Sequence, residues 1–220
     1  MTLEEFGLNK EQIEKFELYS NLLLEWNEKF NLTSITDKEE IIQKHFIDSI
    51  YLVKYVDLSN KLLLDVGSGA GFPGIPLAIV CPTAKITLLE SNGKKVMFLK
   101  EVVKSLKLDN VSIIQGRSEE LDQREHYDFV TARAVKQLNI LLEISVHLLK
   151  VKGIFIAYKG DAESELKEAE KAINKLSLEV IADYKYDLSF GKRELILLSK
   201  MKATPNKYPR SYSQIIKSPL

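Results

Sequence analysis

A glycine-rich segment is the feature that most restricts how this chain can fold. Residues 62–79 read LLLDVGSGAGFPGIPLAI, so an apolar run leads directly into Gly67, Gly69, Gly71 and Gly74. Glycine tolerates tight turns and lets another group come close to the backbone. Such a segment predicts a buried strand, a tight turn and then a helix, with a ligand beside the turn.

The chain after residue 60 alternates between strand-like and helix-like runs. Strands are expected at 62–66, 85–89, 111–115, 128–131, 153–158, 179–186 and 194–199. Helices are expected at about 74–81, 92–107, 137–150 and 162–176. This alternation indicates a parallel sheet with helices on both faces. About seven residues, with Gly191 among them, separate the last two strands, which predicts an antiparallel hairpin. We therefore expect an α/β fold with a seven-stranded, mostly parallel sheet.

A helical cap is expected before this sheet, in residues 1–60. Asn9 and Gln12 have the spacing of a helix-capping box, and apolar residues follow at helical intervals. Asp37 and Glu40 mark the start of a second helical segment. Residues 61–203 are then expected to form the core, and residues 204–220, with three prolines, a basic irregular tail.

The charge of the chain is balanced but unevenly distributed. The 220 residues contain 31 basic and 31 acidic side chains, which excludes a basic field over the whole surface. Residues 1–30 carry seven Glu and three Lys, whereas residues 191–220 carry seven basic side chains and one Glu. This asymmetry suggests that one face meets an anion, although a solvated tail would give the same pattern.

Cysteine usage and hydropathy indicate the cellular setting. Cys81 is the single cysteine, so no internal disulfide can form, which fits a reducing compartment. The acidic start MTLEEFGLNK does not resemble a signal peptide, and no apolar stretch reaches the roughly 20 residues of a membrane span. His45, His126 and His147 lack the spacing of metal ligands. We expect a cytoplasmic monomer without a metal.

An acidic residue narrows the ligand of the glycine turn. Glu90 ends the second predicted strand, 23 residues after Gly67, where a carboxylate commonly holds the two ribose hydroxyls. An adenosine-type ligand is therefore expected, and both nicotinamide dinucleotides and S-adenosylmethionine qualify. Asp65 would repel a pyrophosphate but could pair with an ammonium group, and Pro73 removes an N–H that a pyrophosphate would use. Together with the terminal hairpin, these residues favour S-adenosylmethionine.

The fourth predicted strand limits the methyl acceptor. Residues 127–135 read YDFVTARAV, without the Asp/Asn-Pro-Pro-aromatic motif of exocyclic amine methylation and without a cysteine to attack a pyrimidine. Cys81 precedes Pro82 at a predicted helix end, so it is interpreted as inert core. Methyl transfer depends mainly on alignment, and a general base is needed only when the acceptor must lose a proton. An acceptor with its own lone pair, such as guanine N7, remains.

Polar side chains follow the fourth and fifth predicted strands. Arg133 could reach a methionine carboxylate or hold a target guanine, or it could form only a surface ion pair. Lys159, with Gly160, could contact phosphate or base, or simply end a strand. His45 and Asp48 lie one helical turn apart. They could form a buried hydrogen-bond pair between cap and core, or they could guide RNA.

Eight short motifs occur together in one order. They are NLTSI at 31–35, HFIDS at 45–49, DVGSGAGFPGIPLAI at 65–79, LLESNGKKVMFL at 88–99, GRSEEL at 116–121, ARAV at 132–135, YKG at 158–160 and YPR at 208–210. From about residue 20 to the C-terminus, this set resembles the bacterial small-subunit rRNA guanine-N7 methyltransferases, also called the glucose-inhibited division protein B family. The resemblance implies a Rossmann-like class I methyltransferase fold and S-adenosylmethionine as cofactor. It also implies methylation of a guanine in the decoding-region loop of 16S rRNA, presented free, in the small ribosomal subunit or in an assembly intermediate.

The site residues follow from the strand ends together with the resemblance. The candidate cofactor-binding residues are Gly67, Gly69, Phe72, Glu90, Ser91, Asn92, Ser118, Glu119 and Arg133. The resemblance implies that Ser118 and Glu119 hold the adenine and that Arg133 completes the pocket, where it is also the candidate catalytic residue. The candidate RNA contacts are Lys94, Lys95, Lys159, Arg193, Lys207 and Arg210.

Two features of the sequence leave room for other functions. After YPR the family tail usually carries glycine and several lysines, whereas this chain continues SYSQIIKSPL. The glycine turn alone is also compatible with a nicotinamide-dependent oxidoreductase, or with a non-catalytic RNA-binding module in ribosome assembly that keeps the fold.

Overall fold

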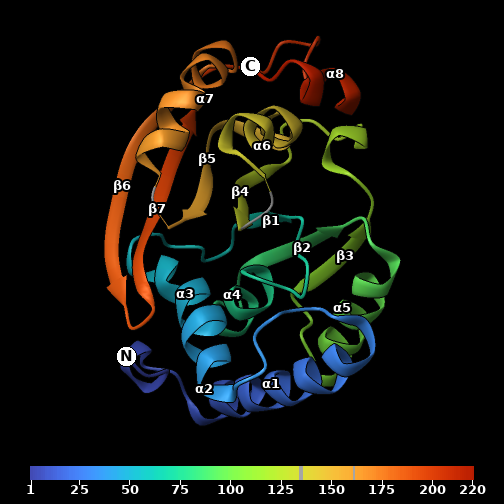
Figure 1. Ribbon diagram of the computed structural model, residues 1–220, viewed down its shortest axis with the longest axis vertical. Helices are drawn as coiled ribbons and strands as arrows, with labels where there is room; N and C mark the ends of the chain where they lie inside the picture. Colours follow the sequence, from blue (N-terminus) through green and yellow to red (C-terminus); the bar gives the residue numbers. More distant parts are fainter. Residues whose placement is uncertain (134–135, 161) are drawn as a thin grey trace.

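A seven-stranded sheet forms the centre of the molecule (Figure 1). The computed structural model describes residues 1–133, 136–160 and 162–220, so the last two residues of the ARAV motif lie outside the described residues. The strands are β1 (Leu62–Val66), β2 (Lys85–Glu90), β3 (Val111–Gln115), β4 (Tyr127–Arg133), β5 (Leu149–Lys159), β6 (Leu178–Leu188) and β7 (Gly191–Lys200). Their spatial order is β3-β2-β1-β4-β5-β7-β6. The predicted sheet is confirmed.

The strand order reverses between β1 and β4, and this reversal positions the site. β1 pairs in parallel with β2 on one side and with β4 on the other. The carboxyl ends of β1 to β5 therefore meet at one edge of the sheet, and a crevice opens where the order reverses. Alternate residues of β1 enter different layers: Leu63 belongs to one buried cluster, whereas Leu64 and Val66 belong to the other.

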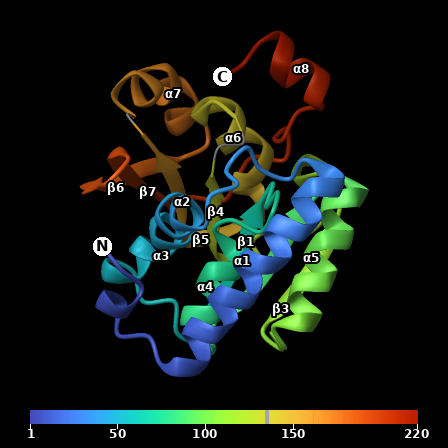
Figure 2. The same cartoon turned by 60° about the horizontal axis from the view of Figure 1, so that its bottom comes forward.

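Helices cover both faces of the sheet. One face is covered by α1 (Lys10–Phe30), α4 (Gly74–Val80) and α5 (Gly93–Ser105). Of these, α1 packs on α4 and α5, α4 packs on β2, and α5 packs on β2 and β3. α6 (Leu138–Ser145) and α7 (Glu163–Lys175) lie together on the opposite face. Figures 1 and 2 both show α1 beside α5 and α6 beside α7. Short 3₁₀ turns lie at Glu4–Phe6, Ser118–Glu120 and Val146–Leu148.

The N-terminal cap is helical, as predicted, and it shares a core with the sheet. Asn9 and Gln12 form the predicted capping box of α1. Asp37 caps the second segment by accepting from the Glu40 N–H. That segment runs through α2 (Lys38–Glu40), a π-helical stretch (Ile41–Ile47), α3 (Asp48–Ile50) and a 3₁₀ turn (Tyr51–Lys54). Buried cap residues such as Phe16 pack in one cluster with sheet residues such as Leu63.

The terminal hairpin differs in length from the prediction. β6 and β7 pair antiparallel, but only residues 189–190 separate them instead of about seven. Each strand is longer than its apolar run, because Asp187 pairs with Lys192 and Leu188 pairs with Gly191. At these positions the side chains do not show the pattern that predicts a strand. Gly191 has a φ of 131°, which suits the tight reversal.

The tail also differs from the prediction of irregular structure. Residues 212–217 form α8 (Tyr212–Lys217), which packs on α6. Ser211 and Gln214 form a capping box at its start. Among the described residues, no helix has the length and apolar character needed to cross a membrane.

Candidate functional site

The glycine turn after β1 is built from hydrogen bonds within the chain. Gly67 and Gly69 have φ values of 68° and 60°, in the left-handed region that favours glycine. The Gly67 N–H donates to the Leu89 carbonyl at 2.8 Å, and the Gly69 N–H donates to Glu90 Oε2 at 2.9 Å. These amides therefore do not form the free N–H cradle that a pyrophosphate would need. The turn offers close approach to the backbone, which favours S-adenosylmethionine over a dinucleotide.

Glu90 braces this turn from the end of β2. Its carboxylate is largely buried, with Oε2 on Gly69 and Oε1 accepting from the Asn92 N–H at 2.8 Å. Asn92 in turn caps α5, where its Oδ1 accepts from the backbone N–H groups of Lys94 and Lys95. Glu90, the predicted ribose-binding carboxylate, thus also fixes the turn, and Asn92 fixes the start of the next helix.

Asp65 has a second role that sequence reasoning did not assign to it. Its Oδ2 accepts from the Gly74 N–H at 2.9 Å, which holds the start of α4. A Cβ on Gly74 would lie 2.8 Å from that oxygen and would overlap Leu88, so only glycine fits there. Burial raises the pKa of Asp65 to about 7. Its Oδ1 is buried and has no hydrogen-bond partner among the described residues, so one acceptor of this carboxylate is unused.

A cavity of about 240 Å³ opens beside the turn; it is called here the β1–β3 cavity. The carboxyl ends of β1, β2 and β3 form most of its wall, and α6 and α8 close it. Its lining residues are Val66, Gly67, Leu89, Ser91, Gly116, Arg117, Ser118, Glu119, Lys136, Ile144 and Tyr212. The structure thus brings four predicted cofactor residues together: Gly67, Ser91, Ser118 and Glu119. Apolar walls with a few polar groups suit a nucleoside.

Phe72 faces the cap instead of this cavity. Its ring stacks on the His45 imidazole with centroids 4.4 Å apart, and Tyr19 and Phe46 pack beside it. The Tyr19 hydroxyl donates to the Ala70 carbonyl. The cap therefore supports the glycine turn from behind, and Phe72 is part of that support.

Arg133 is held in place by the cap. Its Nη1 donates to Asp48 Oδ2 and to the Lys44 carbonyl, both at 3.0 Å. Its Nη2 contacts His45 Nδ1 at 3.1 Å, and its guanidinium carbon lies 5.0 Å from the centroid of the Phe72 ring. Burial, and then the positive charge of Arg133, lower the pKa of His45 to about 3, so the imidazole is neutral. A neutral Nδ1 can accept the arginine hydrogen bond.

Asp48 is the centre of this network. Its side chain is 2% exposed and accepts from Arg193 Nε at 2.9 Å, from Arg193 Nη2 at 3.0 Å and from the Tyr186 hydroxyl at 3.1 Å, in addition to Arg133. The interpretation of His45 and Asp48 as a buried link between cap and core agrees with this geometry. The carboxylate joins α3 to β4, β6 and β7.

A second cavity, of about 360 Å³, lies at the ends of β4 and β5; it is called here the β4–β5 cavity. Its lining residues are Arg133, Lys136, Gln137, Tyr158, Lys159, Gly160, Glu165 and Arg193. Lys159 pairs with Glu165 at 2.5 Å, and the Tyr158 hydroxyl donates to the Ser49 carbonyl. Three predicted functional residues, Arg133, Lys159 and Arg193, therefore surround one opening. Lys136 lines both cavities.

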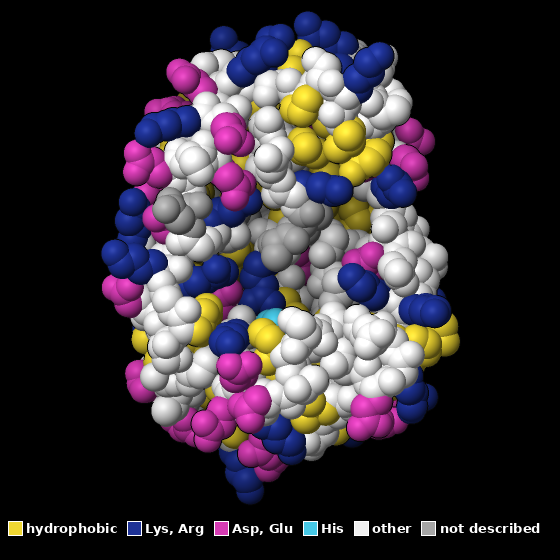
Figure 3. Space-filling model, in the orientation of Figure 1, with side chains coloured by type: hydrophobic (Ala, Val, Ile, Leu, Met, Phe, Trp, Pro, Cys, Tyr) yellow, Lys and Arg dark blue, Asp and Glu magenta, His cyan; other side chains and the backbone are white. Residues whose placement is uncertain are grey.

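The other candidate RNA contacts lie apart from this opening. Lys94 is exposed at the start of α5, with its Nζ 5.7 Å from the Phe30 ring centroid, and Lys95 is half-buried beside it. Lys207 is exposed on the tail. Figure 3 shows a hollow in the middle of the molecule with Lys and Arg side chains along its edge. Positive charge is thus gathered around a depression despite the zero net charge.

Arg210 is used inside the chain. Its Nε and Nη2 donate to the two carboxylate oxygens of Glu143, both at 2.6 Å, and Nη2 also donates to the Ser218 carbonyl. Glu143 is 1% exposed. This geometry gives Arg210 a structural role in holding the tail and does not support its prediction as an RNA contact.

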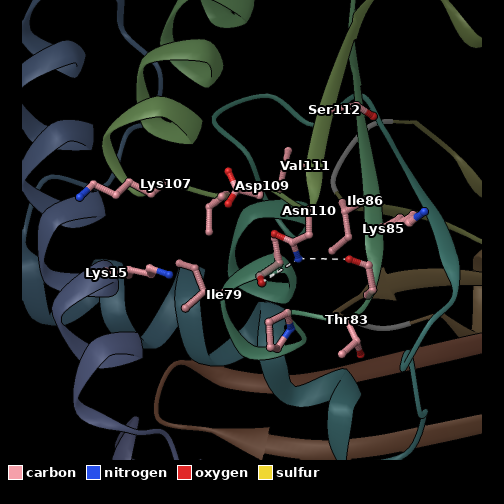
Figure 4. A pocket seen from close by; sticks show the side chains of 14 residues that line it. Lys15, Ile79, Thr83, Lys85, Ile86, Lys107, Asp109, Asn110, Val111 and Ser112 are labelled. Atoms are coloured by element: carbon pink, nitrogen blue, oxygen red, sulfur yellow. Dashed lines mark hydrogen bonds between the residues drawn. The ribbon is translucent and has the colours of Figure 1, made fainter.

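A larger cavity, of about 640 Å³, contains none of the predicted site residues (Figure 4). It lies at the amino ends of β2 and β3, where Lys85 and Val111 begin the strands. Asn110 stands at its centre and donates to three backbone carbonyls. Ligands of open parallel sheets bind at the carboxyl ends of the strands, so this groove is not the candidate site.

Lys136 and Tyr212 are among the cavity residues that the sequence did not predict. Lys136 follows the ARAV motif and carries no motif of its own. Tyr212 had a usable signal, because Ser211 and Gln214 have capping-box spacing and Ile215 follows at helical distance. Among the described residues, no group of three or more His, Cys, Asp and Glu side chains could hold a metal ion.

The sequence matches a known family over most of its length. The family model described as rRNA small subunit methyltransferase G matches residues 12–195. Three similar proteins, each named Ribosomal RNA small subunit methyltransferase G, come from Acetivibrio thermocellus, Mycoplasma capricolum and Bacillus subtilis. They are 46%, 43% and 42% identical to this chain, and the matches cover 98%, 99% and 100% of it and 92%, 95% and 99% of those proteins.

Solved structures of other proteins share the fold of this chain. A SAM dependent methyltransferase from Aquifex aeolicus has a TM-score of 0.59 at 17% identity, covering 77% of this chain and 97% of that one. M. jannaschii TYW2 in complex with AdoMet has a TM-score of 0.57 at 18% identity, covering 70% and 74%. The predicted methyltransferase fold is confirmed, and the relatives favour a methyltransferase over an oxidoreductase or a non-catalytic module. The chain belongs to the rRNA small subunit methyltransferase G family.

Proposed function

We propose that the protein transfers a methyl group from S-adenosylmethionine to N7 of a guanine in the decoding-region loop of 16S rRNA. The observation that carries the proposal is the meeting of two cavities at Lys136, one lined by predicted cofactor residues and one by cationic side chains. A donor and an acceptor bound in them would be neighbours. Family membership supports small-subunit rRNA as the substrate.

The β1–β3 cavity is the proposed cofactor site. S-adenosylmethionine supplies a methyl group on a positively charged sulfur. Ser91 would hold its ribose side, with Glu90 close behind, and Ser118 and Glu119 its adenine, since these residues follow β2 and β3. The unpaired Oδ1 of Asp65 would accept from the ammonium group of the methionine part, directly or through water.

The β4–β5 cavity is the proposed acceptor site. Arg133, Lys159 and Arg193 place positive charge around it, which suits an RNA strand and its phosphates. Arg133 and Arg193 are fixed by Asp48, so their positions are set before RNA binds. Guanine N7 carries its own lone pair, so no side chain has to remove a proton. Alignment by fixed side chains is then the main contribution of the enzyme.

Methyl transfer from labelled cofactor tests the proposal. Wild-type protein is incubated with S-adenosylmethionine carrying a labelled methyl group and with unmodified small-subunit rRNA, either naked or assembled into subunits. Label is expected at one guanine, and cleavage chemistry selective for N7-methylguanine should cut the RNA there. Label found only on protein or small molecules, or at a position that resists this cleavage, would refute the proposal. Comparison of the two RNA forms identifies the substrate particle.

A matched pair of lysines tests the RNA surface. Lys94 lies at the start of α5, at the carboxyl edge of the sheet after β2, and Lys107 lies just beyond the other end of the same helix, beside the larger groove. Lys94→Ala should weaken RNA binding and lower the slope of log affinity against log salt by about 0.7, the value for one single-stranded phosphate contact. Lys107→Ala should leave both unchanged. The reverse result would place the RNA at the opposite end of the sheet.

A further inference from the structure

The C-terminal strap, residues 204–220, is anchored on the core and is not a free tail. Arg210 forms its two-bonded ion pair with buried Glu143, and Arg124 donates to the Tyr208 carbonyl. Asn139 donates to the Leu220 carbonyl. Ile215 is fully buried in the cluster that also contains Val66 of β1. Contacts along the whole strap therefore fix the position of α8.

This anchoring places Tyr212 in the wall of the β1–β3 cavity. The Arg117 guanidinium carbon lies 5.4 Å from the centroid of the Tyr212 ring, and Lys136 Nζ lies 5.7 Å from it. Tyr212 is half-buried, whereas Ile216 on the same helix is 45% exposed. The tyrosine thus faces the cavity, and the isoleucine faces solvent.

We propose that Tyr212 binds the adenine of S-adenosylmethionine, so that the strap forms part of the cofactor site and not of the RNA surface. This inference rests on the proposed cofactor site. Tyr212 lines the same cavity as Ser118 and Glu119, the predicted adenine contacts, and it does not line the β4–β5 cavity. Leu89 and Ile144 add apolar surface to the same cavity. A planar aromatic base packs well on an aromatic ring in such a setting.

Binding measurements on three variants test this role. Tyr212→Ala removes the ring, Tyr212→Phe keeps it, and Ile216→Ala is the control on the same helix. Calorimetry gives the dissociation constants for S-adenosylmethionine and for S-adenosylhomocysteine, which share the adenosine part. Filter binding gives the dissociation constant for small-subunit rRNA and its salt dependence. Thermal unfolding shows whether the strap stays in place.

The expected result separates the two ligands. Tyr212→Ala should raise both cofactor dissociation constants about tenfold, as loss of one base–aromatic stack does, and should leave RNA binding within twofold. The KM for S-adenosylmethionine should rise, while kcat at saturating cofactor stays within twofold. Tyr212→Phe and Ile216→Ala should bind like wild type.

Three outcomes overturn the inference. The first is a folded Tyr212→Ala variant that binds the cofactor as tightly as wild type. The second is a Tyr212→Ala variant that loses RNA binding instead of cofactor binding. The third is a Tyr212→Phe variant that binds the cofactor as weakly as Tyr212→Ala does. A wild-type protein that binds no S-adenosylmethionine would instead refute the proposed function, so the two failures are distinguishable.

Discussion

Replacement of Asp48 by alanine should destabilise the protein more than most single substitutions. The Asp48 side chain is 2% exposed, and its carboxylate accepts hydrogen bonds from Arg133, Arg193 and Tyr186. Its removal would leave two largely buried guanidinium groups without their counter-charge, because the Arg133 and Arg193 side chains are 10% and 19% exposed.

The size of the effect follows from this burial. Removal of one partner from a buried ion pair costs about 3–5 kcal/mol, since the remaining charge stays desolvated. For a chain of this size, each kcal/mol lowers the melting temperature by about 2–4 °C, so a fall of about 6–20 °C is expected. Asp187 is an exposed carboxylate on β6, and Asp187→Ala should change stability by less than about 0.5 kcal/mol.

Chemical and thermal unfolding of the two variants measures the difference. A double-mutant cycle with Asp48→Ala and Arg193→Ala then isolates the coupling of that pair, which should exceed about 1 kcal/mol. If Asp48→Ala were no less stable than Asp187→Ala, the idea that this carboxylate joins cap and sheet would be wrong.

Three further predictions concern neighbouring positions. Gly74→Ala should destabilise the protein by about 1–3 kcal/mol in urea unfolding, because its Cβ would lie 2.8 Å from Asp65 Oδ2; Gly116→Ala, whose Cβ meets nothing within 4 Å, should be neutral. Equal effects would exclude the steric cause. The folded pKa of His45, about 3, lies below its ordinary 6.5, so the unfolded state takes up the proton first as the pH falls. Stability is therefore lost from about pH 6.5 towards pH 3, and His45→Gln should flatten this dependence by about 1.4 kcal/mol per pH unit; an unchanged slope would contradict the burial of His45. Arg133→Lys keeps the charge but cannot reach Asp48 and His45 together, so turnover should fall at least tenfold at saturating cofactor; turnover within twofold of wild type would remove Arg133 from the reaction.

The order of the helices and strands was predictable from the sequence, because the spacing of apolar side chains within each segment reflects which of its faces is buried. Leu62–Val66 is an apolar run interrupted only by Asp65, and the strand has those bounds. β5 instead begins at Leu149, not at 153, because Leu149 pairs with Tyr127 before an irregularity in the ladder. That pairing depends on a strand more than twenty residues away, and no local pattern records it.

Site residues were predictable where they directly follow a predicted strand, because the fold then fixes their location. Gly67, Ser91 and Ser118 follow successive parallel strands, so topology alone brings them to one edge of the sheet. The contact of Asp48 with Arg193 joins residues 145 positions apart, and only the packed structure shows it. The place of Tyr212 in the cavity depends on the anchoring of the strap by Arg210 and Glu143, which lie 67 positions apart in the chain and meet only in the packed structure.

The reversal of strand order between β1 and β4 has a consequence for how this enzyme could diversify. Apart from Lys136, the strand ends and loops that border the β1–β3 cavity lie before β4 in the chain, whereas the β4–β5 cavity is built from β4 onward. In the proposed function, the cofactor and the RNA are thus bound mainly by two successive stretches of the chain. Recombination or deliberate engineering could exchange the RNA that is recognised by replacing the second stretch alone. Ile144 of α6 and Tyr212 of α8 return from the second stretch to the first cavity, so a transplanted half would have to bring equivalents of both side chains with it.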